Sequence, residues 1–180
     1  MDTEPILYTE EGFPGINKVF LSDDEYARAL ETFIVACADA MIVDRRAKKV
    51  YLSKRRAKPM QDTWWVIGGR RAPGVPAREA MQGLFKRETS LMIAPERFEF
   101  LALVEYRLKN RQQMPQEKGT HTQGYTFAVE LTPEELGQVA ANLDPKEYYT
   151  ELGLRAFSLE EIKNGSHHPA IIALAARALQ

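Results

Sequence analysis

The stretch of sequence that decides the fold covers residues 64–91 and reads WWVIGGRRAPGVPAREAMQGLFKRETSL. It opens with aromatic and β-branched residues, a composition typical of a buried strand. A Gly-Gly pair follows, and then a turn that contains Pro73 and Gly74. From Pro76 onward the apolar residues recur at the spacing of one helical face. The stretch therefore predicts a strand, a loop and an amphipathic helix in succession.

The predicted helix carries a carboxylate on its apolar face. The positions on that face are Ala77, Ala80, Met81, Leu84, Phe85 and Glu88. Glu88 falls near the C-terminal end of the helix, where the helix dipole disfavours negative charge, and burial of an unpaired carboxylate is costly. A bound metal ion, a salt bridge to Arg55 or Arg70, or escape of the side chain to solvent would each resolve this conflict. The sequence leaves these alternatives open.

The rest of the chain alternates between strand and helix signals. β-rich runs occupy residues 33–43, 50–53, 64–67, 98–106, 125–131 and 152–157. Capping boxes, in which a hydroxyl precedes a Glu by three residues, predict helix starts after Ser22, Thr132 and Ser158. The polar stretch 109–119 predicts a mobile loop between two strands. We therefore expect an α/β sandwich with a mixed β-sheet, formed by one domain over residues 23–180 and preceded by an N-terminal arm over residues 1–22.

The composition is that of an ordinary globular domain. The 180 residues are 44% hydrophobic and 27% charged, which is enough to bury a core, and the mean hydropathy is -0.37. No apolar run reaches the roughly 20 residues that a membrane span needs. The single cysteine, Cys37, cannot form an internal disulfide bond, and the acidic first residues are unlike a secretory signal. These features predict a cytoplasmic protein with no membrane partner.

Basic residues are concentrated in one segment. Residues 45–71 contain ten Lys or Arg and a single acid, Asp62, although the formal net charge of the chain is -1. Such a segment is typical of a protein that binds an anion, and phosphate, nucleotide and nucleic acid are the candidates. A solvated basic hairpin without a partner is the alternative interpretation.

In this context the stretch 64–91 resembles a Nudix box. In that family's pattern, Gly is followed by five residues, Glu, seven residues and then Arg-Glu-apolar-x-Glu-Glu-x-Gly-apolar. The chain matches the pattern at Gly69, Phe85, Glu88 and Leu91, and departs from it at Val75, Gly83, Leu84, Arg87 and Ser90. Leu84 and Arg87 stand where the pattern has metal-binding Glu residues. The box is therefore degenerate, but the order of elements from residue 33 to residue 179 still implies the α/β/α sandwich of the family.

The reduced box is similar to that of the GDP-mannose mannosyl hydrolase branch of the family. This resemblance implies that Arg55 and Arg70 hold a diphosphate. Arg56 flanks the same strand and turn, so we count it among the candidate substrate-binding residues. Bidentate guanidinium contacts suit the planar oxygen pairs of a phosphate.

The same resemblance implies a metal site. The carbonyl of Gly69 and the carboxylate of Glu88 correspond to ligands of Mg2+ or Mn2+, and Glu151 falls at the position of a third ligand. The catalytic His of the branch corresponds to Leu152, whose side chain cannot accept a proton. Glu151 is therefore the candidate that stands in for it, and Glu88 and Glu151 are the predicted catalytic residues.

Two functions follow from these features. The first is a Mg2+-dependent Nudix-type hydrolase that cleaves a nucleoside diphosphate linked to another moiety, for example a nucleotide sugar. The alternative is a catalytically inactive Nudix-like domain that binds a nucleotide or a protein partner. Nucleic-acid binding ranks last because the chain carries no recognised nucleic-acid motif, and frequent dimerisation among Nudix relatives leaves a homodimer open.

Overall fold

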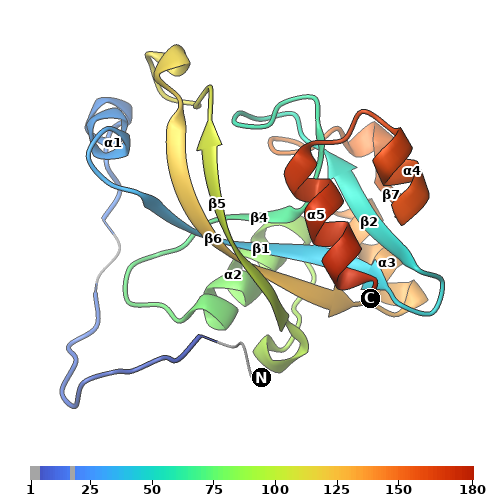
Figure 1. Ribbon diagram of the computed structural model, residues 1–180. Helices are drawn as coiled ribbons and strands as arrows, with labels where there is room; N and C mark the ends of the chain where they lie inside the picture. The colour runs from blue at the N-terminus through green and yellow to red at the C-terminus, as the bar shows by residue number, and fades with distance from the viewer. Residues whose placement is uncertain (1–4, 17–18) are drawn as a thin grey trace.

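The computed structural model describes residues 5–16 and 19–180, and its centre is a mixed seven-stranded sheet (Figure 1). The middle strand is β1 (Val35–Asp44). On one side it pairs in parallel with β6 (Thr120–Glu130), which in turn pairs antiparallel with the edge strand β5 (Glu99–Leu108). These three long strands form the continuous part of the sheet.

The other side of β1 is shared by two strands. Its first half pairs with β4 (Ile67–Arg70) and its last residues pair with β2 (Lys49–Lys54), both antiparallel. β2 pairs further with β3 (Trp64–Trp65) and with β7 (Leu154–Ser158). On this side of β1 the sheet therefore splits into two parts, one formed by β4 and the other by β2. The ends of β2 and β4 lie next to each other where the two parts separate.

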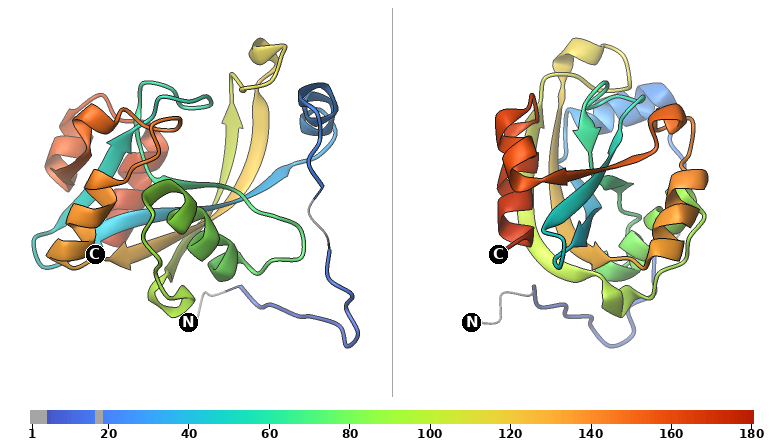
Figure 2. Two further views of the ribbon diagram at one scale, coloured as in Figure 1. Left: turned by 180° about the vertical axis from the view of Figure 1, so that it is seen from behind. Right: turned by 90° about the vertical axis from the view of Figure 1, so that its right-hand side faces the viewer.

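Helices cover both faces of the sheet (Figure 2). The helices α2 (Ala77–Thr89) and α3 (Pro133–Ala141) pack on one face, and α4 (Leu159–Asn164) and α5 (Pro169–Ala178) pack on the other. The helix α1 (Asp23–Leu30) precedes β1 and lies beyond the end of the sheet (Figure 1). Single 3-10 turns occur at Pro95–Arg97, Gln116–Lys118 and Thr150–Leu152.

Because successive side chains of a strand point to opposite faces, β1 contributes to two cores. Ala38, Ala40 and Ile42 pack with the α2 residues Met81, Leu84 and Phe85. Met41 and Val43 pack with the α5 residues Ile171, Leu174 and Ala175. The strand is nearly all apolar as a result, and an ionisable residue within it stands out.

The predicted α/β sandwich with a mixed sheet is confirmed. All three capping boxes are present, with the hydroxyls of Ser22, Thr132 and Ser158 accepting hydrogen bonds from the third amide of the helix that follows. The prediction of a single strand over residues 64–67 is wrong. The chain crosses from β2 to β1 at Val66, so that β3 pairs with one strand and β4 with the other.

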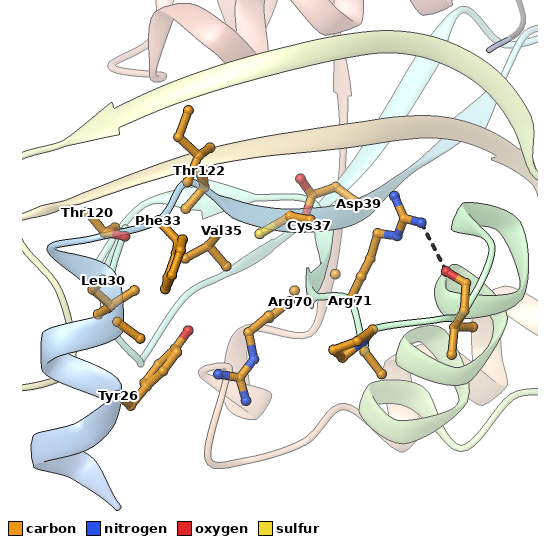
Figure 3. A pocket seen from close by; sticks show the side chains of 18 of the residues that line it. Tyr26, Leu30, Phe33, Val35, Cys37, Asp39, Arg70, Arg71, Thr120 and Thr122 are labelled. Atoms are coloured by element: carbon orange, nitrogen blue, oxygen red, sulfur yellow. Dashed lines mark hydrogen bonds between the residues drawn. The ribbon is translucent and has the colours of Figure 1, made fainter. Parts of the chain in front are cut away.

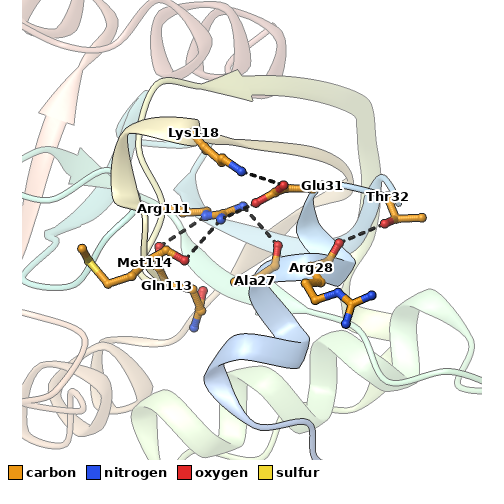
Figure 4. Close-up of polar contacts among 8 residues, drawn as sticks. All are labelled: Ala27, Arg28, Glu31, Thr32, Arg111, Gln113, Met114 and Lys118. Atoms are coloured by element: carbon orange, nitrogen blue, oxygen red, sulfur yellow. Dashed lines mark hydrogen bonds and ion pairs between the residues drawn. The ribbon is translucent and has the colours of Figure 1, made fainter.

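The predicted loop 109–119 contacts α1 through one buried cation (Figure 4). The Arg111 guanidinium is 1% exposed and donates to the Ala27 carbonyl at 3.2 Å and to the Glu31 carboxylate at 2.9 Å. It also donates to the carbonyls of Gln113 and Met114 in its own loop. These hydrogen bonds connect α1 to the loop between β5 and β6.

The N-terminal arm contains no helix or strand between residues 5 and 16. Its apolar side chains are largely exposed there, as shown by Ile6 and Tyr8. The parts of the predicted arm at residues 1–4 and 17–18 lie outside the described residues. No helix within the described ranges has the length and apolar character that a bilayer crossing requires.

Candidate functional site

A cleft of about 1210 Å³ opens where β1 and β4 run past α1 (Figure 3). One end is apolar and aromatic, with Tyr26 and Leu30 from α1 and Phe33 and Val35 from the segment that follows. The other end is polar. It contains Asp39 from β1 and the glycines Gly68 and Gly69 from β4. The cleft therefore offers both an apolar recess and a charged floor.

Glu88 is the buried carboxylate of this floor. Its side chain is inaccessible to solvent, yet both of its oxygens have donors. Arg87 Nη2 donates to Oε1 at 2.5 Å, and the hydroxyl of the buried Tyr148 donates to Oε2. Burial raises the pKa of Glu88, and the hydrogen bonds from Tyr148 and Arg87 oppose that rise. Of the alternatives left open by the sequence, the structure shows a salt bridge, but its cation is Arg87 rather than Arg55 or Arg70.

Two backbone connections place Tyr148 against Glu88. The amide of Asp144 donates to the Glu88 carbonyl at 2.9 Å, which ties the segment after α3 to the end of α2. The amide of Tyr149 donates to the Lys54 carbonyl at 3.0 Å, and Tyr148 forms an isolated bridge with Arg55. The segment 144–149 therefore lies between α2 and the end of β2, and it carries Tyr148 into the space between them.

Arg55 directly follows β2, next to the segment 144–149. Its guanidinium is nearly buried, forms an ion pair with Glu147 at 3.0 Å and stands over the Tyr148 ring at 5.5 Å from the centroid. Its Nε has no hydrogen-bond partner among the described residues. Arg55 therefore brings a cation to the cleft, and Glu147 balances its charge.

Asp39 is the one charged residue of β1 before the last residue of the strand, Asp44. It is 8% exposed, lines the cleft and has no hydrogen-bond partner for its carboxylate within the described chain. A Cβ on Gly68 would lie 2.5 Å from its Oδ1, and a Cβ on Gly124 would lie 3.0 Å from its Oδ2, so these glycines provide its space. Burial and the charge of Glu88 raise the pKa of Asp39 to about 7. Asp39 is therefore a carboxyl group that changes its charge near neutral pH.

The rim of the cleft carries further cations. The Arg70 guanidinium stacks over the Tyr26 ring at 4.3 Å, and Arg71 donates to the Val75 carbonyl at 2.9 Å (Figure 3). Among the described residues that line the cleft, the basic ones outnumber the acidic ones by six to four: Arg55, Lys58, Arg70, Arg71, Arg87 and Arg111 against Glu10, Asp39, Glu88 and Glu147. The cleft therefore favours an anion.

Solved structures with the same fold are MutT/Nudix proteins. The chain superposes on a MutT Nudix hydrolase from Burkholderia pseudomallei with a TM-score of 0.59 and 16% identity, covering 81% of this chain and 98% of that one. It superposes on a MutT protein from Methanosarcina mazei Go1 with a TM-score of 0.59 and 16% identity, covering 83% and 95%. The chain has a Nudix fold. No family model matches the sequence, and no curated protein matches it in sequence.

A third similar structure is the NrtR protein of Shewanella oneidensis in complex with a 27mer DNA. Its TM-score is 0.53 at 13% identity, and the match covers 81% of this chain and 59% of that one. The Nudix fold is thus found both in proteins described as hydrolases and in a protein described with DNA.

Within the Nudix fold, the cleft brings together Arg55, Gly69, Arg70 and Glu88 from the set predicted by sequence. A Cβ on Gly69 would lie 3.9 Å from Glu88 Oε1, so β4 and the carboxylate are adjacent at this residue. Arg56 and Glu151 do not line the cleft. They pair with each other at 3.4 Å on the surface, where Arg56 also stacks over the Tyr149 ring. Glu151 lies in the 3-10 turn Thr150–Leu152, and its side chain is exposed. Glu147, and not Glu151, is the acidic residue of this segment that lines the cleft.

The donor set can be tested against a divalent ion. Mg2+ requires several oxygen ligands, commonly carboxylates. In the part of the chain that the structure describes, no group of three or more His, Cys, Asp or Glu residues could hold a metal ion. Both oxygens of Glu88 are engaged by Arg87 and Tyr148. The residues present therefore do not fit the Nudix metal cluster, and we derive no chemical step through a metal.

Asp39 and Tyr148 were missed by reasoning from the sequence. A signal for Asp39 was present, since it is the one charged residue inside the run 33–43, which otherwise reads as a buried strand. Tyr148 gave no signal. It lies in the irregular segment between α3 and β7, and its contact with Glu88 depends on how distant parts of the chain pack.

Proposed function

We propose that this protein is a Nudix-type hydrolase that acts on a nucleoside diphosphate linked to another moiety, a nucleotide sugar being one such compound. The observation that carries the proposal is the cleft of the Nudix fold, in which basic side chains surround the buried carboxylate Glu88. Arg55 and Arg70 would bind the diphosphate oxygens. The resemblance of residues 64–91 to a Nudix box supports this proposal, because it implies the same types of residue at such a site.

The apolar end of the cleft suits the nucleoside. Tyr26 and Phe33 present aromatic surfaces on which a base can stack. Thr120 lines the same cleft, and its hydroxyl is buried and has no hydrogen-bond partner within the described residues. Unpaired polar groups of this kind favour a ligand with polar edges, because burying them unpaired costs free energy.

Hydrolysis needs a group that takes a proton from the attacking water. Asp39 is suited to this role because it lines the cleft and its pKa is raised to about 7 by burial and by Glu88. Water would attack a phosphorus or an anomeric carbon, the bond to the leaving oxygen would break, and Asp39 would receive the proton. Glu151, the base expected from the sequence, stays a prediction and would have to move into the cleft to act.

The test is an activity assay with a matched pair of variants. The protein is incubated with nucleotide sugars, dinucleotides and nucleoside triphosphates, both with Mg2+ and with EDTA, and products are separated by chromatography. Glu88→Gln should lower turnover about 100-fold or more, because it removes the negative charge that pairs with Arg87 at the floor of the cleft. The control Glu79→Gln lies on the exposed side of α2 and should leave turnover unchanged. Equal turnover of wild type and Glu88→Gln would contradict the proposal.

The second candidate function is binding without turnover, which is favoured by one observation. Arg87 engages the carboxylate that the family uses for metal binding. If catalysis has been lost, calorimetry should detect a nucleoside diphosphate that stays intact after prolonged incubation. Binding of nucleic acid by residues 45–71 predicts instead an affinity that falls steeply with salt.

A further inference from the structure

We propose that the guanidinium of Arg87 takes the place of a divalent cation beside Glu88, so that the cleft binds a diphosphate without a metal ion. The inference rests on the proposed ligand class but does not depend on turnover. The positive charge that binds the phosphate oxygens would be that of Arg87 rather than that of a metal ion. The contacts of α2 with β4 and with Tyr148 support this assignment.

The geometry places Arg87 between the buried carboxylate and the open cleft. Arg87 Nη2 lies 2.5 Å from Glu88 Oε1, while 53% of the Arg87 side chain is exposed. The same nitrogen lies 3.4 Å from where a Cβ on Gly69 would be, which is an ordinary contact distance, so the guanidinium lies against the backbone of β4. A guanidinium has five N–H donors, and the structure shows only the bond to Glu88 for it among the described residues. The other donors remain for a ligand.

The electrostatic balance of the floor makes an additional cation unnecessary. Glu88 is paired with Arg87, and Glu147 is paired with Arg55. A metal ion at Glu88 would have to displace Arg87 and compete with the Tyr148 hydroxyl. Arg70 and Lys58 then add positive charge to the cleft, against Asp39. A phosphate group would meet several fixed cations before any metal ion is added.

The experiment compares ligand binding with and without a divalent ion. ADP and inorganic pyrophosphate serve as probes, and their affinity is measured by isothermal titration calorimetry in EDTA and again in Mg2+. Wild type should bind in EDTA, with an affinity within about threefold of that in Mg2+. Arg87→Glu should weaken binding in EDTA by about tenfold or more, the loss expected for a charge-assisted hydrogen bond, and Mg2+ should recover part of that loss because the variant restores a second carboxylate.

The control is Lys86→Glu, which makes the same charge change on the neighbouring, exposed residue of α2. It should bind like wild type in both buffers, and circular dichroism should show that all variants are folded. Arg87→Gln, which removes the charge without adding a carboxylate, should weaken binding and gain nothing from Mg2+.

The outcomes separate this inference from the proposed function. Binding by wild type that requires Mg2+, or an unchanged affinity of Arg87→Glu in EDTA, would overturn the role of Arg87. Absence of binding in both buffers would overturn the role of Arg87 and the proposed ligand class together. Binding in EDTA without turnover of any compound would support the role of Arg87 in binding and would contradict only the proposed hydrolase activity.

Discussion

Asp39 is a buried carboxyl group whose charge Arg55 offsets only in part. The side chain occupies space left by Gly68 and Gly124, and no described group donates a hydrogen bond to it. Arg55 lowers its pKa, but burial and Glu88 raise it further, so the net effect is a pKa of about 7. Burial of the charged form is costly to the folded state, and groups with such a raised pKa cluster at functional sites.

The cost of Asp39 predicts a pH dependence of stability. The folded pKa of about 7 lies above the unfolded value, so between roughly pH 4 and pH 7 the folded state binds a proton that the unfolded state has released. The free energy of unfolding should therefore fall as the pH rises through this window, by up to about 1.4 kcal/mol per pH unit from this group. Urea denaturation of wild type and Asp39→Asn from pH 4 to pH 8 measures the difference. A parallel pair of curves would contradict the assigned shift.

Tyr148 gives a second prediction at this scale. Tyr148→Phe removes the hydroxyl that donates to the buried Glu88 carboxylate and leaves the ring in place. We expect a loss of about 1–3 kcal/mol in the free energy of unfolding, because a buried charged acceptor loses its donor. The control Tyr149→Phe removes a hydroxyl that donates to Asp62 at the surface and should change stability little. Chemical denaturation at fixed pH compares the two, and equal effects would show that the Tyr148 bond contributes nothing specific.

At the scale of elements, the helix starts were the most predictable feature. A capping box is a local signal, because the hydroxyl and the carboxylate that satisfy the free amides lie within one turn of the chain. The periodicity of α2 is local in the same sense. The division of the Gly-Gly strand into β3 and β4 was not predictable, since it depends on which neighbouring strand each half meets.

The connection between α1 and the loop 109–119 predicts an effect on two elements at once. Arg111→Met removes the hydrogen bonds to the α1 carbonyl of Ala27 and to Glu31, and to two carbonyls of its own loop (Figure 4). We expect destabilisation of about 1–3 kcal/mol, because the carbonyls that Arg111 serves lose their donor, and faster amide exchange in α1. The control Lys118→Ala removes the exposed partner of the same Glu31 and should have little effect. Unchanged hydrogen exchange in α1 would show that Arg111 does not stabilise α1 through its contacts with the loop 109–119.

At the scale of the molecule, the site was only partly visible in the sequence. Arg55, Gly69, Arg70 and Glu88 were predicted from a resemblance to one box and its neighbouring strand, and all four line the cleft. Asp39 and Glu147 join them from segments far away in the chain. Arg56 and Glu151 fall at plausible positions in sequence but pair outside the cleft. Sequence spacing identifies residues on one element, whereas the packing of several elements decides which of them meet.

The parallel pairing of β1 with β6 has a consequence for how the protein folds. Val35 pairs with Thr122 and Val43 with Glu130, so the central ladder joins residues that lie almost half of the 180-residue chain apart. Closing so long a loop is entropically expensive, and proteins rich in such distant contacts fold slowly. During synthesis, β1 must wait until residue 130 has left the ribosome before its longest ladder can form. Until then, the hairpin with β2 is the nearest partner available to hold β1.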